Sequence, residues 1–323
     1  MNFHPIVKKH WPTIKTVLRY AVAIVPIVWI FSQINPARIL VALGHTKWWT
    51  APVVAFYVIL GMYLQGIRWW LLLKAFIPEI PYSLTMRAHF LGIYYSPNNA
   101  IQEVVRTVLI ANKYDYKICW SSTWIAKIFG MLVLAILSVY GLLTLNKSGL
   151  PQGFAQSTIS AFALLILMTV LTFSRRTSRP IMKVLRKIAP QGIRKAIENV
   201  YEAIHEYKSK GRVLVFSFIF TMFIQMILIA GVAFLIYGIT SSFQLNSCLA
   251  FIPLIEIACV ALPITPNGIG IREPLSALMF KQMGLSVEQL GIYIAMYYFA
   301  FSLKLVGGLP LLCDLIKRRK SER

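Results

Sequence analysis

The sequence has little charge, and what charge it has is mostly of one sign. It contains 11 acidic residues against 33 Lys and Arg, and charged residues make up only 14% of its 323 positions. Hydrophobic residues make up 58%, and the mean hydropathy is +0.67. A water-exposed surface needs far more charge than this. The composition therefore excludes a soluble globular domain and predicts an all-α polytopic membrane protein, with residues 1–323 forming a single integral membrane domain.

Cysteine and histidine are also scarce. The four cysteines and five histidines are scattered, and neither set shows the spacing of a disulfide framework or of metal ligands. The chain also lacks a nucleotide-binding motif and a His-Asp pair. We therefore expect no metal, no cofactor and no catalytic residues, and we interpret the protein as a non-enzyme.

Six apolar stretches are long enough to span a hydrocarbon core of roughly 30 Å. The first follows a basic segment but has no small-x-small cleavage site before Asn35, so we interpret it as a retained signal anchor. The predicted spans are Tyr20–Ile34, Trp48–Arg68, Ile118–Leu145, Gln156–Phe173, Val213–Gly238 and Val287–Leu312.

The formal charge of +22 is distributed by side of the membrane. Connections rich in Lys and Arg alternate with connections that hold few or none, as the positive-inside rule requires. This pattern explains the positive net charge without a nucleic-acid partner. It predicts a multi-pass protein of the cytoplasmic (inner) membrane with both termini in the cytoplasm.

The most basic connection is the amphipathic segment 174–212. Its apolar residues follow helical spacing, at Ile193, Ile197, Val200, Tyr201 and Ile204. Anionic inner-leaflet lipids attract such a segment by about 1 kcal/mol per near-surface basic residue. We expect a helix on the inner leaflet; a specific lipid or protein-partner site is the alternative.

Two further apolar regions, Pro81–Asn112 and Leu249–Lys281, each have a polar centre and two arms too short to span separately. We interpret them as re-entrant helical hairpins from opposite sides. Their centres match: Ser96–Glu103 aligns with Thr265–Glu273 after one insertion. A Lys-x-x-Gly follows each hairpin, at Lys127 and Lys304. The repeat halves, roughly 48–145 and 213–312, thus predict an inverted repeat, an architecture of alternating-access transporters.

Each polar centre breaks a helix where lipid offers no hydrogen bonds. Asparagine side chains can supply local bonds, glycines permit unusual dihedrals, and the helix that follows begins with amides suited to a phosphate. Lys127 and Lys304 lie about 12 to 14 Å deep at 1.5 Å per residue. The candidate substrate-binding residues are Asn98, Asn99, Glu103, Arg106, Lys127, Asn267, Gly268, Gly270, Arg272, Glu273 and Lys304.

A buried charge needs a partner, and two arrangements remain open. In the first, Lys127 pairs with Glu103 and Lys304 with Glu273, which merely holds the hairpins in place. In the second, the lysines surround a lipid phosphate together with Arg106 and Arg272. Glu103 and Arg106 can pair on one helix, whereas adjacent Arg272 and Glu273 point to different sides. Glu256 is a weaker candidate.

At these residues the chain resembles the transmembrane, or flippase domain, family of lysylphosphatidylglycerol synthases. The second-half signature is matched closely, by Pro263, Pro266, Gly268, Gly270 and Glu273. The first half keeps only Pro97, Glu103 and Arg106 of its pattern, and Lys127 and Lys304 stand where arginine is commoner. Because Arg323 follows the last span closely, we expect none of the soluble aminoacyl transferase domain that larger relatives carry.

The resemblance implies a lipid flippase. Its substrate would be an anionic or aminoacylated phospholipid, or a polyprenyl-phosphate sugar. One alternative is a membrane-embedded transferase with Glu103 or Glu273 as general base. Another is a non-catalytic membrane partner of a glycosyltransferase or lipid-modifying enzyme.

Overall fold

The computed structural model describes residues 36–95, 99–145, 153–177, 191–261 and 268–309. Every regular element in these ranges is a helix, and five helices are long and apolar enough to cross a membrane. They contain α3 (Thr50–Lys74), α6 (Tyr116–Thr144), α7 (Phe154–Phe173), α10 (Gly211–Thr240) and α13 (Val287–Ser302), the last extended by the 3₁₀ helix η3 (Leu303–Gly308). The protein is thus an all-α polytopic membrane protein, as its composition predicts.

These helices correspond to five of the six predicted spans, and the first, Tyr20–Ile34, lies outside the described residues. One boundary was wrong in a way that matters. The second span was expected to end at Arg68, but α3 continues to Lys74. Arg68 therefore lies inside the helix, because the chain after it, Trp69–Leu73, is still apolar, and Trp69, Leu72 and Leu73 are buried.

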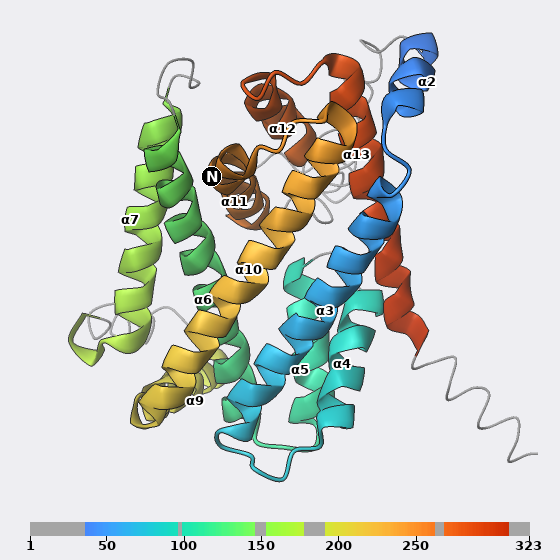
Figure 1. The fold of residues 1–323 in the computed structure, drawn as a ribbon. Coiled ribbons are helices and arrows are strands. Elements are labelled where there is room, and N and C mark those ends of the chain that lie inside the picture. Colours follow the sequence, from blue (N-terminus) through green and yellow to red (C-terminus); the bar gives the residue numbers. More distant parts are fainter. Residues whose placement is uncertain (1–35, 96–98, 146–152, 178–190, 262–267, 310–323) are drawn as a thin grey trace, which may run out of the picture.

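Both predicted hairpins exist as pairs of short helices. The first consists of α4 (Tyr82–Tyr95) and α5 (Asn99–Ala111), which pack against each other; the second consists of α11 (Leu245–Ala261) and α12 (Arg272–Lys281). Figure 1 shows α4 and α5 at one end of the bundle and α11 and α12 toward the other, the end at which α2 (Pro36–His45) also lies. Their re-entry from opposite membrane faces and their relation as an inverted repeat remain predictions.

Each hairpin packs against the lysine-bearing span of the other half. On α6, Gly141 lets the backbone of α11 approach so closely that an added Cβ would lie 2.6 Å from Ala250 Cα. Ser138 Oγ also donates to Ala250 O at 2.8 Å. On η3, a Cβ at Gly307 would lie 2.5 Å from Phe90 O of α4. Small residues at such contacts are typical of helix packing in membranes.

The antiparallel helices α3 and α10 cross one face of the molecule side by side (Figure 1). Glycines on both helices make this contact close. A Cβ at Gly61 would overlap Leu228, and a Cβ at Gly231 would lie 2.6 Å from the Tyr57 ring. This register places the middle of α3 opposite the middle of α10.

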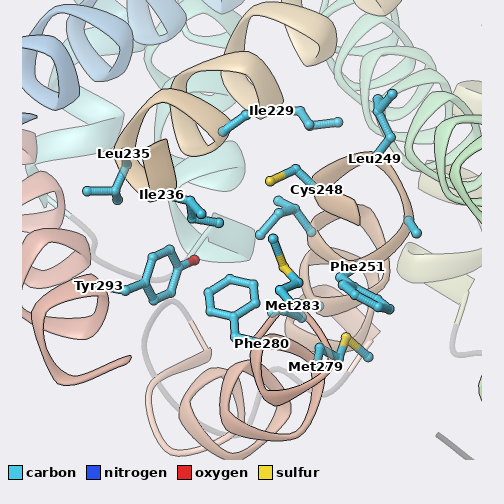
Figure 2. Close-up of a cluster of buried hydrophobic side chains, with 14 of the residues drawn as sticks. Ile229, Leu235, Ile236, Cys248, Leu249, Phe251, Met279, Phe280, Met283 and Tyr293 are labelled. Carbon is cyan, nitrogen blue, oxygen red and sulfur yellow. The ribbon is translucent and has the colours of Figure 1, made fainter. Parts of the chain in front are cut away.

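The largest apolar core surrounds the second hairpin. Figure 2 shows Ile229 of α10, Cys248 and Phe251 of α11, Phe280 of α12 and Tyr293 of α13 converging on one space. Phe280 is fully buried, and its ring meets that of Tyr293 edge-on at 4.5 Å between centroids. Burying aromatic rings of this size fixes the hairpin against α10 and α13.

The amphipathic segment differs from its prediction. It contains α9 (Gln191–Glu206) and the 3₁₀ helix η1 (Tyr207–Lys210), but Ala203, Ile204 and Tyr207 are buried in protein rather than facing lipid. Tyr207 Oη donates to Leu72 O at 3.0 Å. The C-terminal end of the apolar face of α9 is covered by protein because α9 packs on α6. The side chains of Ile193 and Ile197, at the other end of this face, lie outside the described residues.

Candidate functional site

A cavity of about 350 Å³ lies at the centre of the bundle. Residues of α3, α6, α10, α13 and both hairpins line it. Most of the lining is apolar, but four basic and two acidic residues also face it: Arg68, Lys127, Arg272, Lys304, Glu103 and Glu256. So many ionisable side chains in the interior of a membrane protein indicate a functional site rather than a packing core.

The first hairpin holds an arginine behind its glutamate. Arg106 is almost fully buried; it pairs with Glu103 one turn earlier on α5, and its guanidinium lies 4.5 Å from the centroid of Trp69. Arg106 NH1 also donates to His89 Nδ1 at 3.0 Å. Because arginine only donates, Nδ1 must accept, so the His89 proton sits on Nε2 and is donated to Met62 O at 2.9 Å.

The second hairpin repeats this design with different partners. Arg272 at the start of α12 donates to both carboxylate oxygens of Glu256 in α11, at 2.6 and 2.9 Å. Its guanidinium lies 4.2 Å from the centroid of Tyr297, on α13. Each hairpin thus presents an arginine that is neutralised by a glutamate and covered by an aromatic ring, an arrangement that suits the planar guanidinium.

Glu273 serves the hairpin turn rather than the cavity. It accepts hydrogen bonds from Gly270 N at 2.6 Å and from Tyr298 Oη at 2.5 Å. The neighbouring Arg272 turns to Glu256 instead, so the expectation that these adjacent residues point to different sides is confirmed. The amide of Gly270, a candidate substrate-binding residue in the turn before α12, is therefore already occupied by a side chain of the helix that follows.

The two glycines of the second turn have the backbone that the sequence predicts. Gly268 has φ +76° and Gly270 has φ +87°, in the left-handed region that favours glycine. At Gly268 there is also no room for a side chain, because an added Cβ would overlap Cys259 of α11. This close approach brings the turn back against the preceding helix.

The two lysines reach the same cavity from different halves of the chain, Lys127 from α6 and Lys304 from η3. In the described part of the chain, Lys127 has no hydrogen bond or ion pair, although it lies within electrostatic reach of Glu103 and Glu256. The first of the two arrangements considered from the sequence, in which Lys127 pairs with Glu103 and Lys304 with Glu273, is therefore not the one in the structure. Glu103 pairs with Arg106, and Glu273 binds Gly270 and Tyr298, because those partners are nearer in each hairpin.

The predicted site residues thus fall into three groups. Glu103, Lys127, Arg272 and Lys304 line the cavity together. A second group positions or shapes the hairpins from behind the lining: Arg106, Gly268, Gly270 and Glu273. Asn98 and Asn267 lie outside the described residues, as does the side chain of Asn99.

Sequence reasoning missed two buried residues and undervalued a third. Arg68 was assigned to a span end, and His89 was counted only as an isolated histidine. Glu256 was considered minor, yet it is the partner of Arg272. A usable signal for Glu256 was its position in an apolar helix, where an acid requires a cation nearby. No pattern in the chain pointed to His89.

An apolar helical bundle with a charged cavity, to whose lining two hairpins contribute, defines a polytopic membrane protein. The protein belongs to the family described as the lysylphosphatidylglycerol synthase TM region, whose family model matches residues 16–305. A search of curated proteins and a search of solved structures each gave no match.

Proposed function

We propose that this protein is a lipid flippase. It translocates a phospholipid or a polyprenyl-phosphate-linked lipid across the cytoplasmic membrane, and the head group occupies the central cavity during transfer. Both termini are cytoplasmic in this proposal, and the protein makes and breaks no covalent bond in the lipid. Family membership supports a lipid as substrate, because the family is one of lipid-associated membrane proteins.

The observation that carries the proposal is the cavity itself. Four basic side chains and two acidic ones face an interior space of about 350 Å³; Arg68 comes from α3, and the others come from the two hairpins and the helices that follow them. A charge at the bilayer centre costs at least about 2.5 kcal/mol on insertion scales. The basic residues outnumber the acidic ones, so the cavity favours an anion such as a lipid phosphate.

The packing between the halves supports alternating access. The span after the first hairpin packs on the second hairpin, and the helix after the second hairpin packs on the first. An inverted repeat places its elements in this reciprocal way, with the substrate near the interface of the repeats. Rocking of one half against the other would then expose the cavity to each leaflet in turn.

A leaflet-exchange assay tests the proposal. Purified protein is reconstituted into liposomes that contain a trace of phosphatidylglycerol fluorescently labelled on an acyl chain, and external dithionite bleaches the outer leaflet. Protein-containing vesicles should lose the inner-leaflet signal as well, whereas empty vesicles retain it. The assay is repeated with an aminoacylated phospholipid and a polyprenyl-phosphate lipid. Exchange no faster than in empty vesicles for all three lipids would refute the proposal.

A further inference from the structure

Arg68 is the one cavity arginine that no carboxylate of the described residues neutralises. It lies inside α3 with 6% of its surface exposed, and it lines the cavity. Its NH1 donates to Thr221 Oγ1 of α10 at 3.2 Å, but its Nε is buried with no hydrogen-bond partner in the described residues. A buried guanidinium held only by a hydroxyl group lacks the anion that its burial requires.

Space for such an anion is the cavity itself, which Arg68 and Gly130 of α6 both line. The two residues are neighbours in its wall, because a Cβ added at Gly130 would be in van der Waals contact, at 3.9 Å, with Arg68 NH1. Lys127 lies three residues earlier on α6, on the same helix face, and also lines the cavity. The cavity is therefore open beside these two cations, and the glycine adds no side chain to that opening.

The hairpin arginines are poor competitors for the same anion. Arg272 gives both terminal nitrogens to Glu256, and Arg106 gives its terminal nitrogens to Glu103 and His89. Either arginine would have to release an internal partner before it could bind a ligand. Arg68 donates only to the Thr221 hydroxyl in the described residues, so neither Arg68 nor Lys127 has to release a carboxylate.

The walls of the cavity change from polar to apolar along α3 and α10. On α3 the lining runs from Arg68 and Gln65 to Val58 and Val54, while on antiparallel α10 it runs from Gln225 to Leu235. Because Arg68 meets Thr221 of α10, the polar ends of both helices coincide. An anion seated at Arg68 thus has an apolar channel beside it, which fits a phosphate attached to a hydrocarbon chain better than free phosphate.

We propose that Arg68 and Lys127 form the binding site for the phosphate of the lipid, between α3 and α6, and that the two arginine–glutamate pairs frame this site without binding the phosphate in the state described. The assignment deepens the proposed function and rests on it for the identity of the ligand as a transported lipid. Anion binding itself can be measured without transport.

The test measures the melting temperature of the purified full-length protein in a neutral detergent. Three probes are compared: dihexanoyl phosphatidic acid, dihexanoylglycerol, which lacks the phosphate, and inorganic phosphate. We expect saturating phosphatidic acid to raise Tm by about 5 °C, and dihexanoylglycerol to raise it far less. A response to inorganic phosphate alone would identify a phosphate site that does not read the hydrocarbon chain, which overturns the lipid part of the proposal.

Two substitutions locate the site. Arg68→Gln keeps a donor for Thr221 but removes the charge, and it should weaken phosphatidic acid binding about tenfold or more. Because Arg68→Gln can also alter folding, a second variant, Gly130→Leu, leaves Arg68 in place and fills the opening beside it. We expect Gly130→Leu to weaken phosphatidic acid binding, and Gly130→Ala, whose side chain is smaller, to weaken it less. Lys113→Gln, which removes an exposed charge outside the cavity, is the control and should retain the full shift.

The outcomes separate this inference from the proposed function. Binding that both Arg68→Gln and Gly130→Leu retain at full strength overturns the site, even if the wild-type protein exchanges lipid. A wild-type protein that exchanges no lipid but binds phosphatidic acid in an Arg68-dependent manner overturns the flippase and leaves the site standing. The absence of any shift with either phosphate probe overturns the site.

Discussion

Arg272 and Glu256 form a two-point ion pair across the second hairpin, with nitrogen–oxygen distances of 2.6 and 2.9 Å. Both residues line the cavity, but the arginine is 5% exposed and the glutamate 33% exposed, so the glutamate is the more accessible partner. The pair ties the first turn of α12 to α11. It thereby fixes the hairpin tip relative to its own first arm.

Replacing only one partner of this ion pair should lower the stability of the protein more than replacing both. Glu256→Gln leaves a buried guanidinium without a counter-charge, and we expect a loss of about 3 kcal/mol of stability. The double variant Glu256→Met with Arg272→Met should regain most of that loss, because a well-packed apolar pair replaces the ions. Thermal unfolding in detergent measures both. A double variant less stable than Glu256→Gln would contradict this account.

His89 should act by positioning Arg106. Removing the ring in His89→Ala leaves Arg106 NH1 and Met62 O without their buried partner, which costs about 1–3 kcal/mol. His89→Asn keeps one acceptor and one donor and should recover part of the stability and of lipid exchange. Unfolding temperature and leaflet exchange are compared in the two variants. If alanine and asparagine behave alike in both measurements, the hydrogen bonds of His89 are unimportant.

Gly268 and Gly284 offer a matched test of crowding at the hairpin turn. Both have positive φ, +76° and +77°, but a Cβ at Gly268 would overlap Cys259, whereas nothing lies within 4 Å at Gly284. Each alanine variant incurs backbone strain of about 1–3 kcal/mol, and Gly268→Ala incurs the steric overlap in addition. We expect the lower melting temperature for Gly268→Ala. Equal losses would mean that the turn moves freely away from α11.

The cavity lysines should matter more for transport than the basic face of η1. Lys127→Met and Lys304→Met each remove a cavity charge and should slow leaflet exchange at least about tenfold, as loss of one charged contact does. Lys208→Gln with Lys210→Gln, which changes exposed charges only, should leave exchange near wild type. A protein that merely recruits a glycosyltransferase through segment 174–212 would show the reverse order. Deletion of the segment is a poor test, because Tyr207 is part of the core.

Much of the architecture could be predicted because the membrane restricts what a chain can do. The positions of the five described spans and of both hairpins follow from apolar length and from the polar centres alone. The glycine dihedrals at Gly268 and Gly270 also follow, because few other residues reach them. The end of α3 did not follow, since the apolar run continues beyond Arg68 and hydropathy gives no stop signal there.

The pairing of charges inside the cavity could not be predicted in the same way. Sequence spacing brings Glu103 within reach of Arg106, but whether Lys127 on α6 competes for it depends on how α5 packs against α6. Glu256 meets Arg272 because α11 and α12 fold back at a particular depth. His89 and Arg106 are brought together by the contact between α4 and α5. These are tertiary distances of a few ångströms, which no periodicity in the chain encodes.

The glycine contact between η3 and α4 links parts of the chain that are far apart in sequence. Gly307 rests on the Phe90 carbonyl, and Gly308 rests on the Tyr94 ring. The first hairpin therefore cannot swing without displacing the helix that carries Lys304. In the proposed alternating-access cycle, opening toward one leaflet and closing toward the other would then be a single mechanical event, and a covalent staple between these two helices should stop both movements at once.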